Sequence, residues 1–153
     1  PRIQVDRATL AARQAAVFDL NALARPVYEA GRAAQRARDR VDAARRQLAS
    51  AGAEAASLRA EADSLLAALG RVQAELGRFG RAAFLGNAIE AVSAAPTADQ
   101  LWQIDQAWAE APATIEALNA ILRDRLPAFE ARVYTAEARP APIQSVEIPR
   151  RNR

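Results

Sequence analysis

The chain has 153 residues, of which 51% are hydrophobic and only 5% aromatic, and its formal net charge is +3. All 21 basic residues are arginine, and the chain contains no histidine, cysteine or methionine. This inventory excludes an imidazole base, a thiolate nucleophile, a disulfide and a zinc site with thiolate or imidazole ligands. We therefore expect no cofactor and no bound metal.

The first predicted helix spans residues 7–49, with Asp6 as its N-cap. Its apolar positions are spaced three or four residues apart, which is typical of a helix with one buried face. These positions are Leu10, Val17, Leu20, Ala24, Val27, Gly31, Ala34, Val41 and Leu48, interrupted by Arg13, Arg38 and Arg45. Pro26 lies inside the pattern without shifting its phase, so we expect a kink there and not a break.

A turn around Gly52 precedes a second predicted helix over residues 54–77. Its apolar stripe alternates steps of four and three through Leu58, Ala62, Leu65, Leu69, Val72, Leu76 and Phe79. Gly77 and Gly80 predict a break, followed by a shorter helix over residues 81–93.

Thr97 and Gln100 form a capping-box pattern that predicts the start of a helix over residues 97–134. Its apolar stripe runs through Leu101, Ile104, Trp108, Ala111, Ile115, Leu118, Leu122, Leu126, Phe129 and Val133. Pro112 predicts a kink, and Pro127 lies either in a loosened last turn or at the start of a short separate one. The arginine- and proline-containing residues 138–153 are expected to be extended or disordered.

These stripes repeat every seven residues in three segments, and the connections between them are short. Such a pattern favours antiparallel helices that cross at a small angle. The sequence therefore predicts an all-α fold: an elongated up-down bundle of three long helices plus one short helix, with coiled-coil-like packing over residues 1–137. No apolar run is long enough for a transmembrane helix.

Carboxylates are the only side chains left for acid–base catalysis. The candidate pairs are Glu61/Asp63, Asp99/Asp105 and Asp124/Glu130, and none of them lies in an apolar stripe. A glycosidase-like pair needs a raised pKa in an apolar cleft, so we interpret these acids as solvated surface and expect no catalytic residue. No phosphate-binding glycine loop is present.

Two features remain as candidates for contact with a partner. Trp102 lies off the apolar stripe, so it either meets a neighbouring domain or packs under the short helix. The arginines of residues 32–46 either form a solvated, ion-paired surface or contact an anionic partner. The candidates for such a partner contact are Arg36 and Arg40. No aromatic residues alternate with them, as single-stranded nucleic acid binding would require.

Several segments together resemble a known family. They are the opening Pro1–Gln14 stretch, Leu85-Gly-Asn-Ala-Ile-Glu-Ala-Val, Ala95-Pro-Thr-Ala-Asp-Gln, Leu118-Asn-Ala-Ile-Leu and Leu126-Pro-Ala-Phe-Glu. Over about residues 1–135 the chain is similar to the C-terminal helical region of bacterial BNR-repeat or sortilin-like β-propeller proteins labelled glycosyl hydrolases. The resemblance implies a periplasmic or extracellular parent protein whose propeller carries any catalytic site. No catalytic residue of that family corresponds to a position here.

From these observations we expect a non-catalytic docking, spacer or self-association module of a larger exported protein. Its partner would be a neighbouring domain of the same parent or a second copy of the chain. The chain does not begin with methionine, so we expect a fragment or a processed product. Two alternatives stay open: a coiled-coil homo-oligomerisation domain, and a basic helical protein that binds polyanions or nucleic acid.

Overall fold

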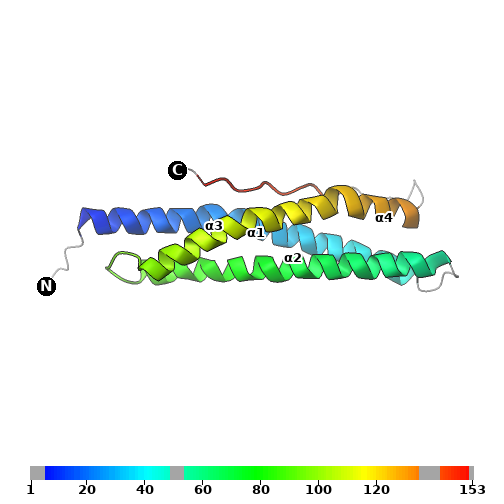
Figure 1. The fold of residues 1–153 in the computed structure, drawn as a ribbon, viewed down its shortest axis with the longest axis horizontal. Coiled ribbons are helices and arrows are strands. Elements are labelled where there is room, and N and C mark those ends of the chain that lie inside the picture. The colour runs from blue at the N-terminus through cyan, green and yellow to red at the C-terminus, as the bar shows by residue number, and fades with distance from the viewer. Residues whose placement is uncertain (1–5, 49–53, 135–141, 152–153) are drawn as a thin grey trace.

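The computed structural model describes residues 6–48, 54–134 and 142–151. Three long helices, α1 (Arg7–Gln47), α2 (Glu54–Glu90) and α3 (Ala98–Ala120), lie side by side and alternate in direction (Figure 1). A π-helical turn, η2 (Ile121–Arg125), and a short helix, α4 (Leu126–Val133), complete the helical part. No strand occurs in the described ranges.

Helix α1 begins where the sequence predicts. Asp6 caps it, because its carboxylate accepts a hydrogen bond of 2.8 Å from the Thr9 backbone N–H. The helix passes through Pro26 without a break, and the buried residues on either side of it stay in phase. The predicted turn around Gly52 lies outside the described residues.

The predicted break in the second helical segment is wrong, since α2 continues through Gly77 and Gly80 to Glu90. A glycine in a helix costs only about 1 kcal/mol relative to alanine. Leu76, Phe79 and Ile89 are all buried, so the same helix face remains packed on both sides of the glycines. Residues 81–93 therefore do not form a separate short helix.

The third segment starts with the predicted capping box: the Gln100 N–H donates to Thr97 Oγ1, and the Thr97 N–H donates to Gln100 Oε1. Helix α3 contains Pro112 without interruption. The π-helical turn η2 comes directly before Pro127, which has no N–H to donate to the carbonyl four residues earlier. The backbone stays in the right-handed helical region from Ala120 through Leu126, so the predicted helix over residues 97–134 continues past Pro127 with a π-helical turn before it.

One apolar core joins the three helices. Most stripe residues of α2 and α3 are buried as predicted, including Leu65, Leu69, Ile115 and Leu118. On α1 the predicted stripe is partly wrong, because Leu10 and Ala24 are exposed. The residues that α1 buries are Ala16, Leu20, Leu23, Val27, Ala30, Ala33, Ala34, Ala37, Val41 and Ala44.

The arginines that interrupt the α1 stripe join α1 to α2. Arg13 donates hydrogen bonds to the carbonyls of Ile89 and Glu90, two of the carbonyl groups at the C-terminal end of α2 that have no partner within the helix. Arg38 donates to Gln73 at 3.1 Å, and Arg45 pairs with Asp63 at 2.7 Å. These arginines interrupt the apolar pattern in the sequence because their side chains bind the neighbouring helix.

The final segment, residues 142–151, is extended and packs against the helices. Ile143, Val146 and Ile148 are partly buried against the core. The amide of Asn119, buried in α3, donates to the Val146 carbonyl at 2.9 Å and accepts from the Val146 N–H at 2.8 Å. Arg151 bridges Asp19 of α1 and Asp105 of α3. The tail, as we call residues 142–151, therefore covers the junction between α1 and α3.

Candidate docking groove

Trp102 lies in the first turns of α3 and is 59% exposed. It borders a shallow depression together with Phe79 and Arg78 of α2. Its exposure agrees with the expectation of a side chain available to a partner. The indole also lies beside α2, although not under a separate short helix, because that helix does not exist.

Arg36 and Arg40 have different surroundings. Arg36 is exposed on α1. Arg40, in contrast, reaches Glu130 of α4 with its Nη2 2.6 Å from Glu130 Oε2, and Glu130 is only 3% exposed. Arg40 is therefore used inside the chain. The interpretation of Glu130 as a solvated acid is wrong, since Glu130 is buried. The sequence did not show this, because its partner Arg40 lies 90 residues away.

The structure does not bring Trp102 together with the two arginines. Trp102 belongs to the end of the molecule where α3 begins, and Arg40 faces α4 at the opposite end (Figure 1). The other carboxylates of the candidate pairs also face nitrogen donors: Glu61 binds Arg132, Asp63 binds Arg45, Asp99 binds Gln103, Asp105 binds Arg151 and Asp124 binds Arg123. These contacts give the carboxylates structural roles.

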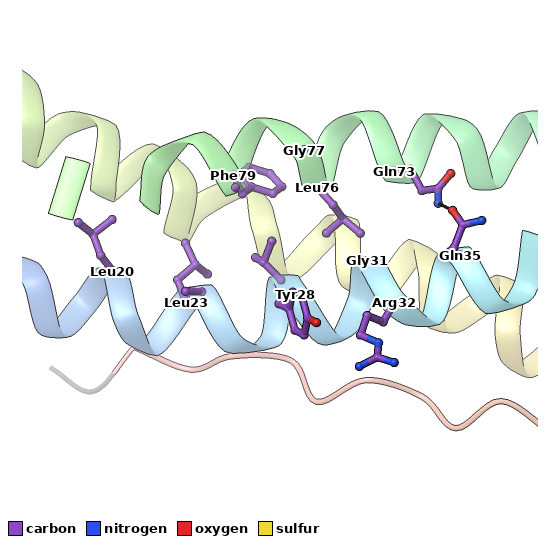
Figure 2. A pocket seen from close by; sticks show the side chains of 13 residues that line it. Leu20, Leu23, Tyr28, Gly31, Arg32, Gln35, Gln73, Leu76, Gly77 and Phe79 are labelled. Atoms are coloured by element: carbon purple, nitrogen blue, oxygen red, sulfur yellow. Dashed lines mark hydrogen bonds between the residues drawn. The ribbon is translucent and has the colours of Figure 1, made fainter. Parts of the chain in front are cut away.

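A groove lies between α1 and α2. It has a volume of about 600 Å³ and mostly apolar walls. Figure 2 shows Leu20 and Leu23 of α1 facing Leu76 and Phe79 of α2 across it. These four side chains also belong to the core, so they form a floor whose conformation is fixed by packing.

One end of this groove is closed by polar side chains. Gln73 of α2 donates to Gln35 of α1 at 2.8 Å and accepts from Arg38 at 3.1 Å (Figure 2). Just before this bridge, the Arg32 guanidinium lies 6.0 Å from the centre of the Tyr28 ring. Tyr28 itself is 65% exposed, so a large aromatic side chain stands at the edge of an apolar groove.

The apolar surface continues toward the start of α1. A second depression, of about 320 Å³, lies beside Leu10, Val17, Phe18 and Asn21. Leu10 is 42% exposed and Phe18 is 69% exposed. Helix α1 thus carries a second apolar stripe beside the one that it buries in the core.

The surroundings of α1 differ from side to side. Between α1 and α3 the tail covers the junction. In the view of Figure 2, α3 runs behind α1 and α2. The α1/α2 groove is open to solvent, and all the residues that line it belong to α1 and α2.

Sequence reasoning missed the groove, although it noticed the residues that shape it. Gly31, Gly77 and Gly80 line the groove, and a Cβ atom added at any of them would meet no other atom within 4 Å. We interpreted Gly77 and Gly80 as a helix break, whereas they leave space on a continuous helix. The feature of the sequence that indicates the groove is the pair Gly77 and Gly80, three residues apart, each directly after a residue of the apolar stripe.

Within the described ranges, no helix has the length and the apolar character that a membrane span requires, and no group of acidic side chains is arranged to hold a metal ion. The chain matches no protein-family model, and no curated protein or solved structure matches it either.

Proposed function

We propose that this chain is a non-catalytic docking module of a larger exported protein, and that the α1/α2 groove is its docking surface. The observation that carries the proposal is the open, mostly apolar groove lined by α1 and α2. The resemblance of about residues 1–135 to the helical region of exported propeller proteins supports the larger context. We further infer that the three helices form an up-down bundle with coiled-coil-like packing.

The chemistry of the groove favours a macromolecular partner. Its floor consists of core side chains, while Tyr28 and Phe18 project from α1 beside it. Exposed apolar and aromatic side chains beside a groove are a candidate interaction site. Aromatic side chains at such a surface contribute a large share of binding energy.

Binding of a polyanion has less support. Of the six arginines between residues 32 and 46, Arg38, Arg40 and Arg45 bind side chains within the chain, and Arg32 lies over Tyr28. A polyanion site needs several cations free to face the same strand of phosphates. Arg32, Arg36, Arg45 and Arg46 are exposed, and of these Arg32 and Arg45 make the contacts just named.

The absence of cysteine gives a direct test, because a single introduced thiol reports on one position. Ala24 lines the groove, and Ala67 is exposed on α2 without lining it. We expect the Ala24→Cys variant to be protected from maleimide when the protein is labelled in its native cells, and to react after purification. The Ala67→Cys variant should react equally in both settings. Equal reactivity of both thiols in cells would contradict the proposal.

The non-catalytic part of the proposal has its own test. The purified chain is incubated with a panel of glycosides and esters, and we expect hydrolysis no faster than in buffer. Turnover that is lost on substitution of a carboxylate in this chain would overturn it.

A further inference from the structure

We infer that the α1/α2 groove binds a single amphipathic helix of a partner protein. The backbone of that helix would approach Gly31, Gly77 and Gly80, and its acidic side chains would face Arg32 and Arg36. This inference rests on the proposed docking function and specifies the kind of partner.

The glycines are the first argument. Each glycine inside a helix costs about 1 kcal/mol relative to alanine. At Gly31, Gly77 and Gly80 the fold does not require glycine, since an added Cβ would meet nothing within 4 Å. All three line the same groove. Glycine is the residue that allows another backbone to approach closely, so these positions fit a partner helix lying between α1 and α2.

The hydrogen-bonding groups of the groove favour a helix over an extended peptide. The tail is extended against α1 and α3, and there the Asn119 amide satisfies both the N–H and the C=O of Val146. In the α1/α2 groove the two amide side chains, Gln35 and Gln73, bind each other. An extended occupant would bring unsatisfied backbone groups onto apolar walls, whereas a helix satisfies its own.

The dimensions agree with this occupant. The lining residues of α1 run from Leu20 to Gln35. At 1.5 Å per residue this wall is about 22 Å long, and the α2 wall, from Gln73 to Gly80, is about 10 Å long, so about two turns of a bound helix would contact both walls. Anchors on one face of such a helix recur every three or four residues, the spacing used by helices that bind in grooves.

The charges beside the groove favour an acidic partner. Arg32 lines the groove, and Arg36 is exposed one turn further along α1. On the same helix Glu29 is paired with Arg25, whereas Asp39 accepts a hydrogen bond from the neutral Gln35 amide and keeps its charge.

The test uses a labelled synthetic peptide as the probe. The peptide is an 18-residue helix with leucine and alanine on one face and glutamate along its flanks, and a matched peptide carries lysine at the same flank positions. Fluorescence anisotropy with the full chain should show binding of the glutamate peptide. The Arg32→Glu/Arg36→Glu variant should weaken that binding by about tenfold and bind the lysine peptide more tightly.

Variants of the glycines test the location. Gly77→Leu and Gly80→Leu fill the groove while raising helix propensity, and each should weaken the glutamate peptide by more than about tenfold. Ala67→Leu adds a bulky side chain outside the groove and should have no effect. Circular dichroism confirms that each variant is folded.

Three results would overturn the inference. The first is equal binding of the glutamate and lysine peptides to the parent chain. The second is unchanged binding by both leucine variants. The third is a dimer in sedimentation that Gly77→Leu makes monomeric, since a second copy would then be the occupant. If the Ala24→Cys variant is protected in cells but neither peptide binds, the docking function stands and only this choice of partner fails.

Discussion

Individual arginines connect the helices of this protein, although its composition suggests a basic surface. Arg13 caps the C-terminal end of α2, Arg40 pairs with buried Glu130, and Arg151 bridges Asp19 and Asp105. The two carboxylates raise the pKa of Arg151 above its ordinary value, chiefly through the hydrogen bond that Arg151 donates to Asp105. Planar guanidinium groups suit such contacts because they offer several donors in a fixed geometry.

The Arg40–Glu130 pair gives a prediction at this scale. Replacing Arg40 by methionine leaves the buried Glu130 carboxylate without its ionic partner. Removing one member of a buried pair is costly, so we expect a loss of about 3 kcal/mol of unfolding free energy in urea. The Arg40→Met/Glu130→Leu variant should recover most of this loss, since the unpaired charge is gone. A double variant no more stable than Arg40→Met would contradict this account.

Asp6 gives a pH-dependent prediction. The hydrogen bonds from Thr9, first its backbone N–H and then its side chain, lower the pKa of Asp6 below its ordinary value of 3.8. The unfolded state therefore binds the proton more readily than the folded one. The stabilisation by this cap is present above pH 3.8 and is lost as the pH falls through the folded pKa.

We expect the amide protons of the first turn of α1 to exchange faster as the cap is protonated. In the Asp6→Ala variant their exchange, corrected for intrinsic rates, should be fast at every pH. A parent chain whose first turn exchanges at the same corrected rate above and below this range would refute the role of the cap.

At the scale of whole elements, the sequence predicted best where the helix signals are local. The capping box at Thr97 and Gln100 is formed as predicted, and most of the apolar stripes of α2 and α3 are buried. It predicted worst where a local signal opposes packing. Gly77 and Gly80 indicate a break, but burial of Leu76 and Phe79 on the same helix outweighs their modest cost.

Substitution of Gly77 and Gly80 should have opposite effects on stability and on binding. Larger residues should stabilise the helix, whereas leucine at these positions should weaken peptide binding. Because their Cβ positions are open and α2 is continuous, Gly77→Ala/Gly80→Ala should raise the unfolding free energy by up to about 2 kcal/mol. Thermal unfolding by circular dichroism measures this. Gly70→Ala in the same helix should change stability in the same direction, since its Cβ would make only an ordinary contact, 3.7 Å from Arg38 Nη1. A lower melting temperature of the double variant would mean that the glycines serve the fold itself.

The tail is the element for which the sequence offered the least information. Its packing depends on Asn119, which lies inside the apolar stripe of α3, and on three aliphatic residues with no helical period, Ile143, Val146 and Ile148. An extended segment that packs on helices has no periodic signature of its own. Residues 142–151 are extended in the structure, and the contacts of this segment could not be derived from the sequence.

Asn119 allows the attachment of the tail to be tested. Asn119→Ala removes both hydrogen bonds to Val146, which should cost about 1–3 kcal/mol of docking free energy. Trypsin should then cleave after Arg150 and Arg151 much faster, while the helices stay intact by circular dichroism. The control is Gln144→Ala on the exposed side of the tail, and faster cleavage in both variants would argue against a specific role of Asn119.

At the scale of the whole molecule, three long helices and one tail leave the two sides of α1 unlike each other. The tail covers the α1/α3 junction, whereas the α1/α2 groove stays open. The sequence predicted the all-helical fold and the three long helices from their apolar stripes. It could not predict the open groove, because this depends on which face α3 packs against and on where the tail lies.

The central claim is that the α1/α2 groove is the docking surface, and amide chemical-shift mapping tests it most directly. The labelled chain is titrated with the glutamate-flanked helical peptide and, in parallel, with the lysine-flanked one. We expect the shifts caused by the glutamate peptide to concentrate on residues 20–36 of α1 and 73–80 of α2. Shifts that instead gather around Trp102 or the tail, or that are the same for both peptides, would contradict the account.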